Sequence, residues 1–422
     1  MNTVQRTYTA RLFPTKEQAE KLRQLSQVRC KLYNMLIEIE NNAFDKGKII
    51  TEYDLDAMLP ALKKENPELK LLNSKAAQRV CKEIYASYKS FFRLIKKDKT
   101  AKPPYKLTDT ETFHTVVYNQ SGWAFKDDKV KLNGITLHYK IKDGIDITKL
   151  NVKEVKLKFI NGKFLLDLTS NIDVDVPERL VIENKVLAID LGVKTLATCV
   201  DNTGKVLIIP NKAAKIRKYF KREMKKVKEK MEKKQKGSRA WTKLNKTKKR
   251  LQHRSNMQVK DTLHIQSKKL ADMNYKTIVV GDIKVKKLTS REGVNAEKKN
   301  LRKSFYKTAI KRFVDLLSYK CTDRGNEVET ISERWTTQTN CLTGKLFKQK
   351  VDLSDRELWL NDNTLIDRDL NSAINIMRRY EHNHLALVTM PLDVSNVVAS
   401  NNLALEKTNL SLLKRKHATS VV

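Results

Sequence analysis

The hydrophobic and polar positions of the N-terminal part of the chain predict one strand followed by helices. Residues 4–12 alternate polar and apolar side chains, as a half-buried strand does. Pro14 and Thr15 then open a helical pattern, and a second helical pattern covers about 73–96. Leu22, Leu25, Val28, Leu32 and Leu36 continue the first pattern at helical spacing. The apolar stripe of the second pattern is expected to be core and consists of Ala76, Val80, Ile84, Tyr88, Phe92 and Leu94.

Between about 110 and 178 the pattern becomes that of strands. Short alternating runs are separated by Asn-Gly and Asp-Gly pairs. In VKLKFINGKFLLDL, the pair Asn161-Gly162 predicts the two-residue turn of a β-hairpin. The preceding segment 96–106 is basic and contains proline, which predicts a linker. The sequence therefore predicts a β-rich module after the helical one, whose sheet the first strand can join.

Strands and helices alternate from residue 186 onward. Strand patterns cover 186–209, 276–280 and 327–332, and helical patterns cover 211–235, 300–322 and 366–380. The helical stripes contain Ile216, Phe220, Met224, Val227, Met231, Phe305, Ala309, Phe313, Leu316, Leu370, Ala373, Ile374 and Met377. This order of elements is typical of an RNase H-like fold, so we expect an α/β multidomain chain.

The charge of the chain indicates a polyanionic partner. Lysine and arginine number 85 against 48 acidic residues, a formal net charge of +37. Residues 212–254 alone contain 20 Lys/Arg against 3 Glu. Such an excess favours binding to nucleic acid phosphates, which releases counterions; the alternative is non-specific stickiness of a lysine-rich protein. A membrane surface is less favoured, because no basic amphipathic terminal helix or lipidation motif is present.

Other sequence features bound the compartment. The N-terminus has no apolar signal-peptide segment, and no run of eighteen apolar residues occurs. We therefore expect a protein that is neither secreted nor membrane-spanning. The five cysteines lie far apart without a CxxC pair, which suits buried thiols in a reducing compartment.

Asp190 is the one carboxylate in the apolar run VLAIDLGVKTLATC (186–199). A carboxylate in a buried strand is costly unless it is paired or binds a cation. In RNase H-like nucleases, carboxylates from separate elements converge on two divalent ions, and Mg²⁺ prefers such oxygen ligands. The alternative is a structural aspartate that caps a bend or pairs with a lysine.

Four motifs carry a family resemblance. They are AIDLGVKTLATCVDNTG (188–204), DRDLNSAINI (367–376), WTTQT (335–339) and RTYTARLFPTKEQ (6–18). The first two resemble the first and third RuvC motifs of the TnpB family of transposon-encoded RNA-guided nucleases, which includes Fanzor proteins and is related to small type V CRISPR effectors. WTTQT resembles the Y-T-S-Q-T before that family's zinc ribbon, and RTYTARLFPTKEQ resembles the start of its wedge domain.

The resemblance covers about residues 1–380 and implies a domain order. It implies a RuvC nuclease domain of RNase H-like fold and a wedge β-barrel with a helical recognition insertion. The expected segments are a first wedge strand (1–13), a helical recognition domain (14–100), the wedge β-barrel (101–183), the RuvC domain (184–339) with a basic helical insertion (211–270), a degenerate target-nucleic-acid-binding insertion (340–366), the last RuvC helix (367–381) and a C-terminal tail (382–422).

The resemblance also implies three metal ligands. Asp190 and Asp369 match the family's aspartates, whereas Asp367 is expected to cap the last helix or to orient Arg368. The family's second motif ends its strand with glutamate, but Gly281 stands there, in IVVGDIKV. A branch of the family has its glutamate directly after the neighbouring strand, beside a Gly-Asp pair at the original place, so the resemblance implies Glu333 as the replacement. Adjacent strands lie about 5 Å apart, which lets its side chain reach the same metals. Asp282 is the candidate for a supporting or substitute carboxylate, and the alternative for Glu333 is a surface charge beside a basic groove.

The zinc ribbon is also altered. Cys341 stands alone where the family often has two CxxC pairs, and one thiol cannot build a four-ligand zinc site. We expect no zinc, and instead a small metal-free hairpin or loop. Its expected apolar contacts are Leu342, Phe347, Val351 and Trp359.

The function that these features predict is RNA-guided cleavage of double-stranded DNA next to a short adjacent motif. The expected cofactor is two Mg²⁺ ions, with Mn²⁺ as a substitute, and the expected partners are a guide RNA, derived from a transposon end or similar, and target DNA. A monomer is favoured. The alternatives are a nuclease-dead RNA-guided DNA-binding repressor and an RNase H-like transposase or resolvase. We expect the protein in the cytoplasm or nucleoid of a bacterium, or in the nucleus for a eukaryotic or viral host.

Overall fold

The computed structural model describes residues 2–108, 112–141, 145–174, 182–282, 309–352, 355–361, 363–384 and 392–400. The chain divides into two compact units, Met1–Val174 and Asp175–Val422. The division after residue 174 lies close to the predicted end of the β-barrel at residue 183. The predicted helical module and the predicted β-rich module thus belong to one unit.

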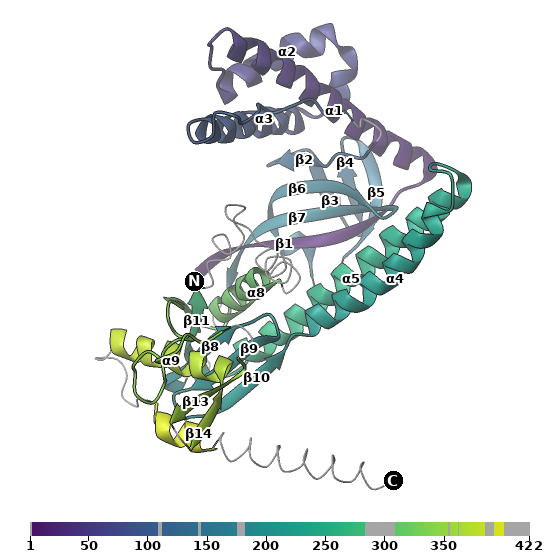
Figure 1. Ribbon diagram of the computed structural model, residues 1–422. Helices are drawn as coiled ribbons and strands as arrows, with labels where there is room; N and C mark the ends of the chain where they lie inside the picture. The colour runs from purple at the N-terminus through teal and green to yellow at the C-terminus, as the bar shows by residue number, and fades with distance from the viewer. Residues whose placement is uncertain are drawn as a thin grey trace. The chain divides into compact units, whose positions relative to one another are not determined.

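The first unit contains a barrel-like antiparallel sheet of seven strands (Figure 1). The strands are β1 (Asn2–Phe13), β2 (Val116–Asn119), β3 (Trp123–Lys126), β4 (Lys129–Leu132), β5 (Ile135–Lys140), β6 (Asn151–Ile160) and β7 (Lys163–Val174). Their order is β2-β6-β7-β1-β5-β4-β3. Because β1 pairs with both β5 and β7, the prediction that the first strand joins this sheet is confirmed.

The predicted hairpin turn is present between β6 and β7. Asn161 and Gly162 have φ values of +53° and +78°, the left-handed region that a type I′ turn requires. Ile160 pairs with Lys163 across the turn. The chemistry of the Asn-Gly pair therefore fixes the register of β6 and β7.

Three helices accompany this sheet: α1 (Lys16–Asp45), α2 (Glu52–Glu65) and α3 (Ser74–Ile95), with short 3₁₀ turns η1 (Pro67–Leu71) and η2 (Ile147–Lys149). Thr15 caps α1 in a capping box with Gln18, and α3 covers the predicted range. The sequence analysis missed α2. It contains Pro60, a residue that argues against a helix interior, but Thr51 and Asp54 form a capping box that marks its start.

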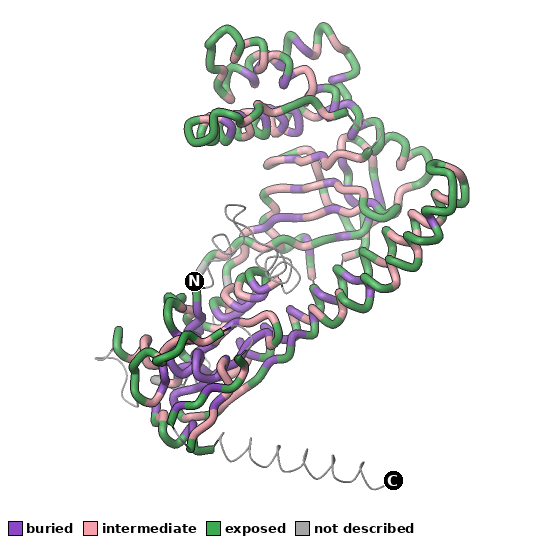
Figure 2. The backbone as a smooth tube through the Cα atoms, in the orientation of Figure 1, coloured by how far each residue is buried: buried purple, intermediate pink, exposed green. Residues whose placement is uncertain are grey.

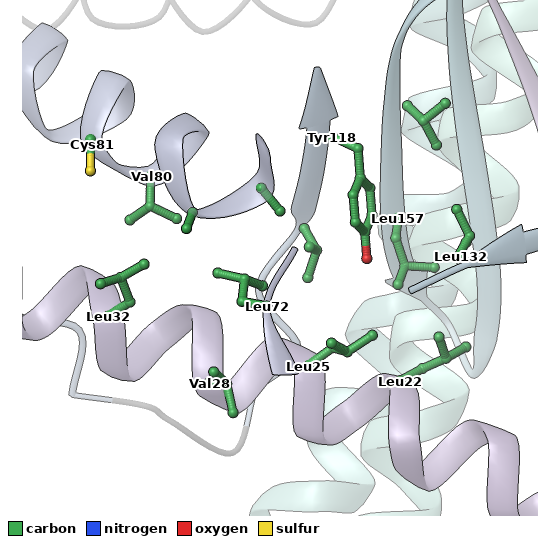
Figure 3. Close-up of a cluster of buried hydrophobic side chains, with 14 of the residues drawn as sticks. Leu22, Leu25, Val28, Leu32, Leu72, Val80, Cys81, Tyr118, Leu132 and Leu157 are labelled. Carbon is green, nitrogen blue, oxygen red and sulfur yellow. The ribbon is translucent and has the colours of Figure 1, made fainter. Parts of the chain in front are cut away.

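The helices and the sheet of this unit share one hydrophobic core. Figure 3 shows Leu22, Leu25, Val28 and Leu32 along α1 and Val80 on α3, the helix that packs beside it. Tyr118, Leu132 and Leu157 of the strands continue the same core. Most of the predicted stripe is buried. The prediction for Leu94 is wrong, because its side chain is 52% exposed near the end of α3, whereas Phe91 is buried.

Glu40 of α1 is a carboxylate inside this core. It is 3% exposed, its Oε1 has no hydrogen-bond partner in the described part of the chain, and burial raises its pKa to about 7. A raised folded pKa means that Glu40 costs no stability below about pH 4.5 and destabilises progressively as the pH rises towards 7.

Glu40→Gln is therefore expected to gain stability relative to the wild type as the pH rises. The difference in unfolding free energy should grow by up to about 3 kcal/mol between pH 4.5 and 8. Denaturant titrations at several pH values would measure it, with exposed Glu38→Gln as the control. An equal pH dependence for Glu40→Gln and the wild type would contradict the prediction.

The second unit contains a mixed sheet of five strands, β8 (Ile182–Leu191), β9 (Thr195–Asp201), β10 (Val206–Pro210), β11 (Tyr275–Asp282) and β12 (Glu327–Ser332). Their order is β10-β9-β8-β11-β12. β8, β9 and β10 are antiparallel neighbours, whereas β11 runs parallel to both β8 and β12. Strands were predicted at each of these places.

Helices pack on both faces of this sheet. The helices are α4 (Lys212–Glu232), α5 (Arg239–Ala271), α8 (Ile310–Thr322) and α9 (Arg368–Asn383), and β13 (Glu357–Asn361) pairs with β14 (Thr364–Asp367). Leu187 and Ile189 of β8 share a core with α5 and α8. Ala188 shares the other core with α9 and β13. The part of the predicted helix at 300–308, with Phe305, lies outside the described residues.

α4 and α5 form a long basic hairpin. Figure 2 shows most of its length as exposed or intermediate, and the predicted helical stripe is buried only at Phe220 and Met231, with Ile216 half-buried. Its cationic side chains therefore remain largely available to solvent. Among the described residues, every helix is too short or too polar to cross a bilayer.

Candidate functional site

Asp190 lies near the carboxyl end of β8, in the middle of the sheet. It is paired with Thr198 of β9, and Ile189 before it is paired with Val280 of β11. Because side chains alternate along a strand, Asp190 projects to the same face as Ala188, the face that α9 covers. The strand thus places one carboxylate beneath the start of α9.

Glu333 lies at the carboxyl end of β12, at the same end of the sheet as Asp190. β11 and β12 are parallel, with Gly281 opposite Ile331, and Glu333 is the first residue after β12. A Cβ added to Gly281 would lie 2.1 Å from Oε1 and 2.4 Å from Cγ of Glu333. The Glu333 side chain therefore occupies the space that a side chain at position 281 would need.

The pKa values of these carboxyl groups indicate that they interact. Burial raises the pKa of Asp190 well above its ordinary value, and the charges of Glu333 and Asp369 raise it further, against the opposing charge of Arg368. Burial also raises the pKa of Glu333 to about 7, with a contribution from Asp282. Several carboxyl groups close together without a cation are unfavourable when ionised, so a bound cation would stabilise this arrangement.

Asp369 lies in the first turn of α9, where it is 8% exposed. Asp367 caps this helix, since its Oδ1 accepts hydrogen bonds from the backbone N–H groups of Asp369 and Leu370. The predicted capping role of Asp367 is therefore confirmed. Arg356 Nη2 donates to Asp369 Oδ2 at 2.6 Å, and Arg368 Nη2 donates to Oδ1 at 3.3 Å.

The ligand atoms that these residues offer are of the kind that magnesium prefers. Asp190, Glu333 and Asp369 supply only carboxylate oxygens, and the buried Oε1 of Glu333 has no hydrogen-bond partner among the residues that the structure describes. Within the described ranges, no three His, Cys, Asp or Glu side chains are grouped closely enough to hold a metal ion. Asp369 forms an ion pair with Arg356. To bind a metal ion, Asp369 would have to release Arg356 and coordinate the cation instead.

Arg356 is a site residue that the sequence analysis missed. It begins the segment that contains β13, and its backbone carbonyl accepts a hydrogen bond from Arg368 N at 2.8 Å. Its Nε is buried without a hydrogen-bond partner among the described residues. No periodicity or motif distinguishes Arg356 from the many other arginines, so only the fold identifies it.

The interval 340–366 contains the predicted hairpin, formed by β13 and β14. Leu342, Phe347 and Val351 pack against the adjoining core as predicted. The prediction for Trp359 is wrong, because its side chain is 63% exposed. Strand alternation turns Trp359 outward and buries its neighbours Leu358 and Leu360 instead.

Side-chain amides connect this interval to α9. Asn371 Oδ1 accepts from Cys341 N at 3.0 Å, and Asn371 Nδ2 donates to Thr339 O at 2.9 Å. Asn375 Nδ2 donates to Thr336 O and Thr339 O. Asn340 Nδ2 donates to Leu360 O at 2.8 Å. These buried amides form hydrogen bonds with backbone N–H and C=O groups in a segment that contains little regular structure.

Comparison with protein families finds three matches. The family OrfB_IS605, described as a probable transposase, matches residues 170–292. A Cas12f1-like TNB domain matches 311–376, and a helix-turn-helix domain of OrfB_IS605 matches 1–48. Residues 2–45 fold as strand β1 and the single helix α1, so they do not form a helix-turn-helix here.

Comparison with individual proteins agrees with these matches. A curated protein of Streptomyces pristinaespiralis, named "Putative RNA-guided DNA endonuclease", is 24% identical over 387 residues, which are 89% of this chain and 90% of that protein. A Cas12f1–sgRNA–target DNA complex matches with a TM-score of 0.52 and 16% identity, covering 86% of this chain and 83% of that one. The mini-RNA-guided endonuclease CRISPR-Cas_phi3 matches with a TM-score of 0.49 and 9% identity, covering 89% and 92%. The Cas12f1 match shows a similar fold.

Proposed function

Because this chain belongs to the TnpB-like family, we propose that it is an RNA-guided DNA endonuclease of the RuvC type. The observation that carries the proposal is that the charges of Glu333 and Asp369, from two other elements, act on the buried carboxyl group of Asp190. In the described residues the three groups are not yet close enough to hold an ion, so a bound cation would have to draw them together. The strand order, with helices on both faces, supports an RNase H-like nuclease domain. The relative from Streptomyces supports RNA guidance and DNA as the substrate.

We assign Asp190, Glu333 and Asp369 as ligands of two Mg²⁺ ions, for which Mn²⁺ can substitute. The ions would activate water and stabilise the leaving oxygen of the cleaved phosphodiester. Asp190 is held in place by β8, and Glu333 is held over Gly281 by the end of β12. Asp282, which is exposed at the end of β11, supports the site through its negative charge.

Arg356 and Arg368 hold Asp369 in position. They neutralise its charge, which otherwise acts on the carboxyl group of Asp190. Such paired arginines are also suitable donors to a phosphate oxygen. The chain's own groups therefore orient one carboxylate of the site.

The proposed partners are a guide RNA and double-stranded DNA carrying a short adjacent motif. The exposed cations of α4 and α5 supply a surface for phosphates. The remaining domain assignments follow the family: residues 1–13 and 101–183 as the wedge, 14–100 as the recognition domain and 340–366 as the target-binding insertion. We propose a monomer that acts where its target DNA is, in a bacterial nucleoid or a eukaryotic nucleus.

A nuclease-dead RNA-guided repressor is the second candidate. Gly281 and the engagement of Asp369 by Arg356 favour it, because a site without three available carboxylates would not cleave. A transposase or resolvase would not require a bound RNA.

The test begins with RNA that co-purifies with the full-length protein. This RNA would be sequenced, and its guide segment would be replaced to match a plasmid with randomised flanks. We expect Mg²⁺-dependent cleavage of the matched plasmid, and none with an unmatched guide or with EDTA. Guide-dependent binding without cleavage would instead establish the repressor, and the absence of bound RNA would favour the transposase or resolvase.

We also propose that the interval 340–366 folds without zinc. Asn371→Ala should lower the unfolding free energy by about 1–3 kcal/mol, because it leaves the buried N–H group of Cys341 unpaired, whereas Thr336 O and Thr339 O keep Asn375 as a donor. Exposed Asn274→Ala is the matched control. Zinc chelation should leave the melting temperature unchanged, and metal analysis of the purified protein should find no stoichiometric zinc; stoichiometric zinc would contradict the proposal.

A further inference from the structure

A pocket of about 470 Å³ lies in the first unit, and its lining contains none of the proposed metal ligands. It is formed where β1 ends, where α1 begins and where β6 turns into β7, elements that can be followed in Figure 1. Its lining includes three cationic and three aromatic side chains: Arg11, Arg23, Lys163, Phe13, Phe159 and Phe164. Nothing in the proposed cleavage chemistry uses them.

The cations of this pocket are held against aromatic rings. The guanidinium of Arg11 lies 4.7 Å from the ring centroid of Phe13. The guanidinium of Arg23 lies 5.0 Å from Phe159 and 5.7 Å from Phe164. Such stacking reduces the freedom of each arginine and leaves its N–H donors available.

Carboxylates do not neutralise this pocket. Arg11, Arg23 and Lys163 form no ion pair with any aspartate or glutamate in the portion of the chain that the structure describes. Elsewhere in the same unit, Arg29 pairs with Glu83 and Lys158 with Asp167. The pocket thus combines available cationic donors with aromatic surface, of which Phe13 is 45% exposed.

A ligand that matches this lining needs both an anionic group and a flat apolar face. A nucleotide has both, and the volume lies within the range of about 300–1,000 Å³ of small-ligand pockets. The bases of a duplex are stacked on one another, so their faces are not available. An unpaired nucleotide can place its base on an aromatic ring and its phosphate against arginine.

We propose that this pocket binds an unpaired nucleotide of the guide RNA. The inference rests on the proposed function, which requires an RNA to be bound before any DNA. RNA is favoured because proteins recognise RNA mainly through loops, bulges and ends with unstacked bases. The phosphate contacts Arg11, Arg23 and Lys163, and the base stacks on the exposed ring of Phe13.

The test localises RNA on the full-length protein. An oligouridylate carrying 4-thiouridine is cross-linked by light, and the modified peptides are identified by mass spectrometry. We expect cross-links in peptides that contain Phe13 or the turn at 159–164. Arg11→Gln/Arg23→Gln should weaken this cross-link by about fivefold to tenfold, and Arg11→Lys/Arg23→Lys should weaken it nearly as much, because lysine keeps the charge but loses the planar contact.

The control is Lys70→Gln/Lys82→Gln, which removes two exposed charges of the same unit outside the pocket and should leave the cross-link unchanged. Cross-links confined to α4 and α5, or equal losses in the control and the arginine variants, would overturn the proposal. Stronger cross-linking of 4-thiothymidine DNA than of RNA would overturn the assignment to RNA. Guided cleavage that persists without a pocket cross-link would refute only this inference, whereas absence of all RNA binding would refute the proposed function.

Discussion

Asp190→Asn is expected to abolish guided DNA cleavage, with a loss of about a thousandfold or more. The substitution preserves the size of the side chain but removes a charge that the proposed cations need. RNA binding should remain, because Asp190 lies on the sheet face beneath α9 and not in the basic hairpin. Cleavage of a guide-matched plasmid and RNA retention on the same preparation would measure both.

Asp190→Asn should also make the protein more stable without Mg²⁺. Burial and the charges of Glu333 and Asp369 raise the pKa of Asp190, so ionised Asp190 destabilises the fold until a cation binds. The melting temperature of the wild type should rise with added Mg²⁺, and that of Asp190→Asn should not. Asp315→Asn, which removes an exposed carboxylate on α8, is the matched control. Full cleavage by Asp190→Asn would refute the assignment of Asp190 as a ligand.

Local patterns predicted most elements correctly because their causes are local. Alternation marked β1, the Asn161-Gly162 pair marked the hairpin, and the Thr15 cap marked the start of α1. The misses have physical reasons as well. Pro60 argues against a helix, so the pattern did not predict α2. The helix forms nevertheless, because Leu55, Leu59 and Leu62 are buried around the proline and this packing stabilises it.

Burial of single residues depends on neighbours that sequence patterns do not specify. Leu94 continues the apolar stripe of α3 but lies near the end of the helix, where less of the core remains to cover it. Trp359 is apolar, yet its strand has only one covered face, and Leu358 and Leu360 occupy it. A one-residue difference in register decides which side chain is inside.

The candidate site was predicted in part for the same reason. Asp190 stood out as a carboxylate in an apolar strand. The adjacency of β11 and β12 was expected from an RNase H-like sheet, and the structure confirms it. The ion pair between Arg356 and Asp369 could not be predicted, because it joins an irregular segment to a helix. Only tertiary structure brings such groups together.

Gly281→Ala is expected to reduce cleavage by about a hundredfold or more, as strongly as Glu333→Gln. The added Cβ would overlap the Oε1, Cδ and Cγ atoms of Glu333. These atoms belong to a flexible side chain, so the strand can stay in place while the carboxylate moves away. The melting temperature should therefore change little while cleavage falls, and both can be measured on one preparation.

Transferring the carboxylate between the two positions is the decisive measurement. Positions 281 and 333 share one space, so a glutamate could enter it from β11 as well as from the end of β12. Glu333→Gly alone should be inactive, and Gly281→Glu/Glu333→Gly should recover part of the lost cleavage. Gly281→Gln/Glu333→Gly is the matched control and should remain inactive, since it fills the space without a charge. Wild-type cleavage by Glu333→Gln would show that Glu333 is not a ligand, and Asp282→Asn would then be the variant to test. Cleavage by Gly281→Glu/Glu333→Gly but not by Gly281→Gln/Glu333→Gly would show that the position of the charge, and not the strand that carries it, determines catalysis.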